Sequence, residues 1–188
     1  AMGAHKAIHI NDSAFEGSDS FVYAKALAKL LEGKTYDLVI GGKQAQDTDA
    51  GLTTSMLAEF LQLPQVSNVA KVAETASDKL IVHRKGDNGN EVIEVSFPAV
   101  LTVNDSLNEP RLASLRGIMQ AKKKPIETMD LASLGLEESS VGATASPTSV
   151  VGVSEPEGRK AGQKFEGDEE EVTKNVIDLL VNEAKILS

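Results

Sequence analysis

The chain has 188 residues, 41% of them hydrophobic and 25% charged, which fits a globular protein with room for one domain and an extension. Its formal net charge is −9 and its aromatic content only 4%, so it lacks the basic surface and the stacking side chains with which proteins bind nucleic acids. It contains no cysteine, which excludes disulfides, thiolate metal sites and cysteine nucleophiles, and no apolar run approaches the ~18 residues of a membrane-spanning helix.

The first third of the chain alternates between strand and helix patterns. Apolar alternation predicts a strand over His5–Ile10. A helix follows, with N-cap candidates at residues 18–20 and a stop at Gly33. Its apolar residues, at helical spacing, are Phe21, Ala24, Leu27, Ala28 and Leu31. A strand over Tyr36–Ile40 and a helix over Leu52–Leu63 come next, and this order predicts a parallel sheet with crossover helices.

A polar, glycine-bearing loop joins the second strand to the second helix. The apolar run Leu38–Ile40 is followed by Gly41-Gly42, and Thr53 stands where the helix begins. Ligands of open α/β sheets bind outside the carboxyl ends of strands, and a helix N-terminus offers unpaired N–H groups to an anion. The loop has neither the P-loop nor the G-x-G-x-x-G pattern, so a nucleotide site and an ordinary polar connection both stay open. Asp47 and Asp49 suit ribose or metal binding, but also turns and caps.

The pattern then becomes antiparallel. Strands are predicted over Lys79–Arg84 and Glu91–Phe97, joined by a tight turn at Asn88-Gly89, since both residues tolerate positive φ. Pro98 precedes another predicted strand, Ala99–Val103.

The segment Asn108–Lys124 combines apolar and basic residues. Its apolar members are Leu112, Leu115, Ile118 and Met119, and its basic members are Arg111, Arg116 and Lys122–Lys124. Pro110 is a possible helix start, which Gly117 weakens. One interpretation is a basic amphipathic helix that packs on its own domain. The other is a projecting recognition element, whose apolar anchor enters a partner's pocket while the charges steer the encounter.

The last quarter of the chain differs in composition. Residues 137–167 are rich in Ser, Thr, Gly and Pro and predict an extended arm. A helix is predicted over Asp168–Leu187, with acidic residues in its first turn. Its apolar stripe consists of Val172, Val176, Leu179, Leu180, Ala184 and Leu187. An arm followed by an amphipathic helix indicates docking on another body. We therefore divide the chain into an α/β nucleotide-binding domain, 1–136, and a docking arm and helix, 137–188.

Residues for bond chemistry are not apparent. The three histidines have no metal-ligand spacing, and there is no G-x-S-x-G motif or Ser/His/Asp set. The sequence thus argues against a self-contained enzyme, and no catalytic residue or metal ligand is assigned.

Together these segments resemble the β subunit of electron-transfer flavoprotein, from Ala1 to about Leu187. Four motifs carry the resemblance: G-K-Q-A-x-D at Gly42–Asp47, N-E-P-R at Asn108–Arg111, A-K-K-K at Ala121–Lys124 and P-x-x-R-x-A-G at Pro156–Gly162. The hairpin shares the family's spacing at Val82, Arg84, Asp87, Glu91, Ile93 and Pro98, and departs from it at Lys85 and Asn88. A-M-G-A at the start looks like an internal part of the family's fold. We therefore expect the first strand–helix unit to be missing; a small complete domain is the alternative.

The resemblance implies a Rossmann-like α/β fold with a mostly parallel sheet, crossover helices, an antiparallel hairpin and an extended C-terminal arm ending in a helix. It also implies a heterodimer with an α subunit, which shares one FAD with this chain. This chain would additionally hold AMP, or a second FAD in bifurcating relatives. The cofactor-binding residues would be Gly42, Lys43, Gln44, Ala45, Gln46, Asp47, Thr48, Asp49, Ala50, Gly51, Leu52 and Thr53. The partner-recognition residues would be Asn108, Glu109, Pro110, Arg111, Leu112, Leu115, Ile118 and Met119, with Leu115 as the anchor.

The function implied is that of an electron-carrier subunit, not an enzyme. The carrier would accept electrons from acyl-CoA and related flavin dehydrogenases and pass them to a quinone reductase or another acceptor. It would reside in the bacterial cytoplasm, or in the mitochondrial matrix of a eukaryote, with no membrane insertion and no nucleic acid partner. A stand-alone adenine-nucleotide-binding module of stress-protein type is the alternative, and an inactive fragment is a third possibility.

Overall fold

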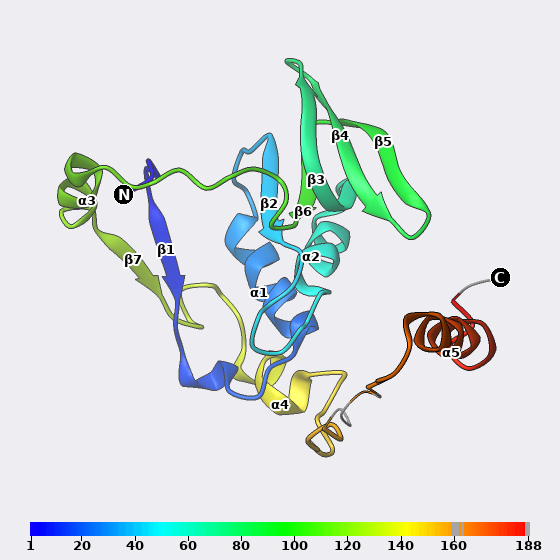
Figure 1. Cartoon of the computed structure of the whole chain (residues 1–188). Helices are drawn as coiled ribbons and strands as arrows, with labels where there is room; N and C mark the ends of the chain where they lie inside the picture. The colour runs from blue at the N-terminus through cyan, green and yellow to red at the C-terminus, as the bar shows by residue number, and fades with distance from the viewer. Residues whose placement is uncertain (159–161, 163, 187–188) are drawn as a thin grey trace. The chain divides into compact units, whose positions relative to one another are not determined.

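The computed structural model describes residues 1–158, 162 and 164–186, which form two units (Figure 1). The first unit is Ala1–Ser149 and the second begins at Val150. Residues 137–149, which the sequence assigned to the arm, therefore belong with the first unit. They include a 3-10 helix, η2 (Glu138–Ser140), and helix α4 (Gly142–Ala145).

A five-stranded sheet is the centre of the first unit, in the order β2–β6–β3–β4–β5. The strands are β2 (Leu38–Gly42), β3 (Gln65–Thr75), β4 (Lys79–Gly86), β5 (Gly89–Ser96) and β6 (Ala99–Val103). Strands β2, β6 and β3 run parallel, while β4 and β5 form an antiparallel hairpin beside β3 (Figure 1). The predicted α/β class is thus confirmed, with a mostly parallel sheet, an antiparallel element and a C-terminal helix.

Two strands lie outside this sheet. Strand β1 (Ala7–Ile10) pairs in parallel with β7 (Ile126–Met129), residue by residue from Ala7 opposite Ile126. The sequence predicted β1, two residues longer at its start, but not β7. A 3-10 helix, η1 (Ser13–Phe15), connects β1 toward the first long helix.

Two helices link the strands. Helix α1 (Ser20–Leu31) has Asp19 as its N-cap, whose Oδ1 accepts the N–H groups of Phe21 and Val22 at 3.0 and 3.1 Å. Gly33, with φ of 70°, follows its end as predicted. Helix α2 (Thr53–Leu61) lies beside α1, and the Phe21 and Phe60 rings meet edge to face at 5.2 Å.

The apolar core has two clusters, one under the sheet and one around α1. The sheet cluster contains Val66, Val69, Leu80, Val82, Val95, Ala99 and Leu101. The α1 cluster contains Phe15, Val22, Ala26, Leu131, Leu134 and Val141. Because Val141 is only 2% exposed in the second cluster, burial fixes residues 137–149 onto α1, and each such side chain contributes about 1.5–3 kcal/mol.

Two aspartates reinforce these attachments. The Asp12 carboxylate accepts the N–H groups of Ala14 and Leu131, both at 3.0 Å. These hydrogen bonds lower the pKa of Asp12, and the bond from Ala14 has the larger effect. Asp19 accepts both the N–H and the hydroxyl of Thr148, at 3.1 and 2.7 Å. Desolvation is the largest single effect on the pKa of Asp19 and raises it, but the bonds from Thr148, Val22 and Phe21 together lower it.

Two predicted boundaries in the sheet need correction, and one strand was missed. Gly41 and Gly42 do not follow β2; they are its last residues, paired with Thr102 and Val103. The hairpin turn lies one residue earlier than predicted, because Gly86 pairs with Gly89 and leaves Asp87-Asn88 as the loop. Strand β3 was not predicted at all.

The missed strand β3 is irregular. Its pairing with β6 shifts register between Val66 and Val69, and its pairing with β4 shifts between Val69 and Lys71 and again between Val72 and Glu74. Each bulge inserts a residue and breaks the alternation of buried and exposed side chains. The period-2 signal that identifies strands is therefore absent from the sequence here.

In the second unit, residues 150–158 are extended, and Val150, Val151 and Val153 are almost fully exposed. Helix α5 (Glu169–Asn182) has Asp168 as its N-cap and three glutamates in its first turn, as predicted. It ends before the predicted Leu187, which lies outside the described residues, as do Arg159 and Ala161 of the expected arm motif. In the described part of the chain, no helix is long and apolar enough to cross a membrane.

Candidate functional site

A polar cavity of about 550 Å³ opens at the carboxyl ends of β2 and β6, beside β3. It is lined by Gly42, Lys43, Gln44, Gln46, Asp49, Asn68, Lys85, Val103, Asn104 and Asp105. Ligands of open α/β sheets bind at this edge, and the volume falls within the usual range of ligand sites, roughly 300–1,000 Å³. The cavity is therefore the candidate binding site.

The loop on one side of the cavity is held by its own hydrogen bonds. Lys43 donates its backbone N–H to the Val103 carbonyl at 2.8 Å, which continues the pairing of β2 with β6. Gln44 Nε2 donates to Asp49 Oδ1 at 2.6 Å, and Asp49 itself adopts a positive φ of 55°. The Asp47 carboxylate accepts the N–H of Thr48 at 2.9 Å. Both aspartates thus act as turn residues, which the sequence had left open.

The start of α2 lies immediately behind this loop. Its N-cap residue, Leu52, provides no side-chain hydrogen bond to the first turn, so the N–H groups there are not capped by a side chain. Gly41 permits the close approach of α2 to β2, because a Cβ at this position would lie 2.2 Å from Thr54 Oγ1. Thr54 in turn donates its hydroxyl to the Gly42 carbonyl at 3.4 Å.

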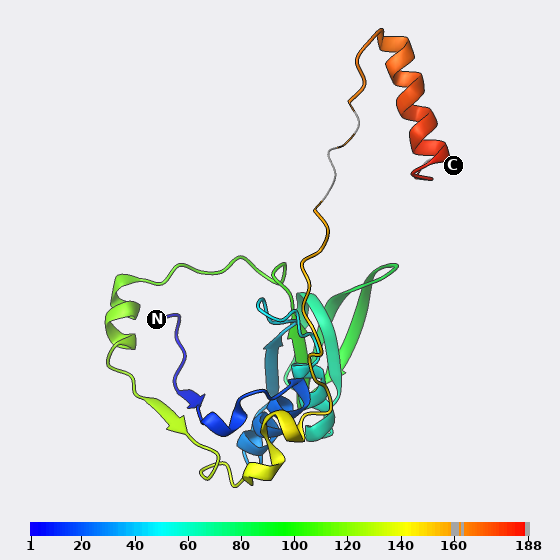
Figure 2. The same cartoon turned by 90° about the horizontal axis from the view of Figure 1, so that it is seen from below.

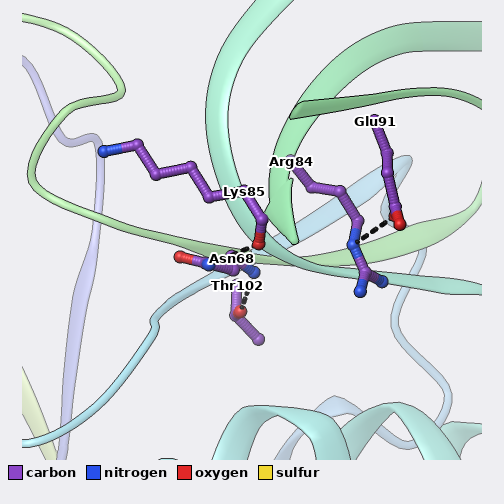
Figure 3. Close-up of polar contacts among 5 residues, drawn as sticks. All are labelled: Asn68, Arg84, Lys85, Glu91 and Thr102. Carbon is purple, nitrogen blue, oxygen red and sulfur yellow. Dashed lines mark hydrogen bonds and ion pairs between the residues drawn. The ribbon is translucent and has the colours of Figure 1, made fainter. Parts of the chain in front are cut away.

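Asn68 lines the cavity from outside the loop, and Figure 3 shows part of its polar contacts. Its backbone N–H donates to the hydroxyl of Thr102 at 2.8 Å, and its side-chain Nδ2 donates to the Lys85 carbonyl at 2.7 Å. Its Oδ1 accepts a hydrogen bond of 2.9 Å from Asn104 Nδ2. Asn68 thereby contacts β4, Thr102 near the end of β6, and Asn104 just after that strand. Among the described residues, Thr102 is the one buried polar side chain, 2% exposed.

Four charged residues line the cavity with balanced signs: Lys43, Lys85, Asp49 and Asp105. The ion pairs of the described residues involve other cations, so the two ammonium groups are available to a bound anion. Beside Lys85, Arg84 Nε lies 3.0 Å from Glu91 Oε2 (Figure 3). We regard this contact as an ion pair across the hairpin and not as a hydrogen bond, because the same N–H has no partner of hydrogen-bond geometry among the described residues.

Five of the twelve loop residues expected from the sequence line the cavity, and seven do not. The seven are Ala45, Asp47, Thr48, Ala50, Gly51, Leu52 and Thr53. The cavity lining also includes five residues that were not predicted: Asn68, Lys85, Val103, Asn104 and Asp105. For Asn104 and Asp105 a signal existed, since they are polar and follow the predicted strand Ala99–Val103 at its carboxyl end. Asn68 and Lys85 gave none, because β3 itself was not recognised.

The expected recognition segment contains helix α3 (Leu115–Ala121), which begins five residues after Pro110. Ser114 is its N-cap and accepts the N–H of Gly117 at 3.0 Å. None of its residues is buried, so its apolar side chains lie on the surface of this unit. The exposed apolar side chains are Leu112 at 98%, Leu115 at 75%, Met119 at 61% and Ile118 at 40%.

Two basic residues around α3 contact the start of the chain, which lies beside that helix (Figure 2). Arg111 Nη2 donates to the Met2 carbonyl at 3.4 Å, and Lys124 Nζ donates to the Ala4 carbonyl. A Cβ at position 117 would lie 2.4 Å from the Ala1 carbonyl oxygen. Glycine at 117 therefore allows the helix to approach this segment.

Comparison with known proteins gives matches to a single protein family. The family model described as "Electron transfer flavoprotein domain" matches residues 1–134. Similar relatives, each named "Electron transfer flavoprotein subunit beta", come from Thermoanaerobacterium thermosaccharolyticum (41% identity over 96% of this chain and 69% of the relative), Mycobacterium bovis (36%, over 96% and 68%) and Bos taurus (41%, over 93% and 66%).

Proposed function

The chain belongs to the electron transfer flavoprotein family, as a β subunit, and from this premise we propose that it forms an FAD-containing electron carrier with an α subunit. The carrier accepts electrons from acyl-CoA and related flavin dehydrogenases and passes them to a quinone reductase or another acceptor. The observation that carries the proposal is the family match over residues 1–134, together with 36–41% identity to β subunits. We propose a location in the cytoplasm of a bacterium, or in the mitochondrial matrix of a eukaryote.

The cavity beside Gly42–Thr53 is the proposed site of an adenine nucleotide, either AMP or a second FAD. The residues present fit such a ligand. Amide groups of Gln44, Gln46 and Asn104 offer donors and acceptors to the base and ribose, while Lys43 and Lys85 offer charge to a phosphate. Leu52 and Thr53, two of the loop residues that do not line the cavity, lie at the start of α2.

The chain's own contribution is binding and orientation, not bond chemistry. When bound, FAD supplies the redox chemistry of the complex. The residues of the cavity hold a nucleotide at the sheet edge, where the loop and strand ends are fixed by hydrogen bonds. No catalytic residue is proposed.

Two exposed segments are proposed as contact surfaces. Helix α3 and residues 108–114 dock the dehydrogenase, with Leu115 as anchor, because their apolar side chains are exposed. The extended residues 150–158 and α5 dock on the α subunit. Val151 is 99% exposed and no residue of Glu169–Asn182 is buried, so both elements have apolar surface that a partner can cover.

The nucleotide content of the purified complex with an α subunit tests the proposal. Denaturation followed by mass spectrometry of the released molecules should give one FAD and one AMP for a simple carrier. Two FAD and no AMP would identify a bifurcating complex. A complex that releases no flavin contradicts the proposal. Gel filtration separates it from the stand-alone nucleotide module, which would remain a nucleotide-binding monomer without the α subunit.

A further inference from the structure

Asn68 has a backbone conformation that only a special local structure maintains. Its φ is 58°, in the left-handed region that costs most non-glycine residues free energy, although asparagine tolerates it better than most. It lies within strand β3, inside the register shift against β6 (Val66 to Val69) and just before a shift against β4 (Val69 to Lys71). Bulges and positive φ values in a strand cluster near binding sites, where they direct a side chain.

The side chain of Asn68 has one orientation. Its Nδ2 faces the Lys85 carbonyl at 2.7 Å, and because a carbonyl only accepts, this end must be the amide nitrogen. Its Oδ1 therefore faces Asn104 Nδ2, at 2.9 Å. Asn104 is fixed in the same way, because its Oδ1 accepts the N–H and the hydroxyl of Ser106 at 3.0 and 2.6 Å.

These bonds form a directional chain from Ser106 through Asn104 and Asn68 to the Lys85 carbonyl. Figure 3 shows its last step, from Asn68 to Lys85. Both asparagines line the cavity. An amide NH₂ carries two donors. In the described residues Asn104 Nδ2 donates one of them, to Asn68, so the second is available to an acceptor in the cavity.

We propose that Asn68 is a positioning residue of the nucleotide site, which orients the Asn104 amide toward an acceptor atom of the bound adenine nucleotide. The inference rests on the proposed function, since it requires a nucleotide in this cavity. Asn68 acts through Asn104, and the left-handed backbone at Asn68 directs its amide between β4 and β6. The β3 bulge is thus part of the site, which the loop Gly42–Thr53 alone does not complete.

The test is a double-mutant cycle on the complex with its α subunit, stripped of bound nucleotide and titrated with AMP and with FAD. The variants are Asn68→Gly, which keeps the left-handed backbone without strain, Asn104→Ala, and the two combined. If Asn68 acts through Asn104, each single change weakens nucleotide binding about 10-fold, the effect of one lost hydrogen bond. The double variant is then also about 10-fold weaker and not 100-fold, because the two residues share one interaction.

Gln62→Gly is the matched control. Gln62 has a φ of 54° at the end of α2 and does not line the cavity, so the same substitution there should leave nucleotide affinity unchanged. Additive effects of the two asparagine changes, or an Asn68→Gly complex that binds nucleotide like the wild type, overturn the role of Asn68 but leave the proposed nucleotide site intact. A wild-type complex that binds neither AMP nor FAD overturns the proposed nucleotide site as well. If Asn68→Gly does not fold, Asn104→Ala by itself decides, and unchanged binding by that variant overturns the proposal.

Discussion

Replacement of Leu115 by alanine tests the proposed recognition surface. The Leu115 side chain is 75% exposed at the first residue of α3, so its loss removes little packing from the chain itself. Full burial of a leucine contributes about 1.5–3 kcal/mol, and a partner pocket would bury about three quarters of this side chain anew. The expected loss is therefore about 1–2 kcal/mol of docking free energy, which corresponds to an about 5- to 30-fold lower efficiency of electron transfer.

The assay is the rate of flavin reduction in the complex by a flavin dehydrogenase, measured at subsaturating carrier concentration so that kcat/KM is obtained. Flavin content and melting temperature should match those of the wild type, because alanine is a better helix former than leucine. Val92→Ala is the control, since Val92 on β5 is also apolar and 66% exposed but lies outside the recognition segment. If Leu115→Ala transfers electrons as efficiently as Val92→Ala, with intact flavin, the reasoning about this surface is refuted.

Four further outcomes are expected. Asp19→Ala should lower the free energy of unfolding, measured in denaturant titrations, by about 1–2 kcal/mol, because α1 loses its N-cap and Thr148 loses its hydrogen-bond acceptor. A change smaller than the error of the titration would contradict the role of this cap. Because the pKa of Asp12 and of Asp19 is lowered in the folded state, their contribution to stability is complete above the ordinary carboxyl pKa of about 4 and is lost as the pH falls through the lowered values. Unfolding free energy measured against pH should therefore decline in acid, and less steeply for Asp19→Asn; equal slopes would argue against the linkage. Gly41→Ala should reduce the amount of nucleotide that the purified complex retains, since the new Cβ would lie 2.2 Å from Thr54 Oγ1. Adding Thr54→Ala should restore part of the retained nucleotide. If Gly41→Ala retains as much nucleotide as the wild type, the loop adapts freely. Thr102→Val should lower the free energy of unfolding by about 1–3 kcal/mol, because the backbone N–H of Asn68 loses its hydrogen-bond acceptor. A melting curve like that of the wild type would mean that the buried hydroxyl is dispensable.

Strands β2 and β6 and helix α1 were predicted from local patterns. The apolar run Ala99–Val103 and the capped helix after Asp19 are each determined by neighbouring residues, burial on both faces in one case and a side-chain cap in the other. Such signals are complete within a few residues of sequence. The rule that ligands bind at the carboxyl ends of strands then identified the loop Gly42–Thr53 beside the cavity.

The other wall of the cavity depends on contacts that no local pattern encodes. Bulges interrupt the alternation of buried and exposed residues in strand β3. Asn68 forms hydrogen bonds with Lys85 and Asn104, which are 17 and 36 residues away in the sequence. The start of α3 shows the same limit. Pro110 suits a helix N-terminus, but the helix begins after Ser114, whose side chain caps it. The sequence thus offers two possible N-termini for α3, and the surrounding structure decides between them.

The central claim is that this chain, paired with an α subunit, forms a carrier of electrons. The most direct measurement is anaerobic reduction of the purified complex by a catalytic amount of an acyl-CoA dehydrogenase with excess acyl-CoA, followed by the visible absorbance of the flavin. The account predicts that the oxidised flavin is bleached to completion, at a rate proportional to the amount of dehydrogenase. A complex whose flavin is reduced by dithionite, but by none of a panel of flavin dehydrogenases with their substrates, would contradict it.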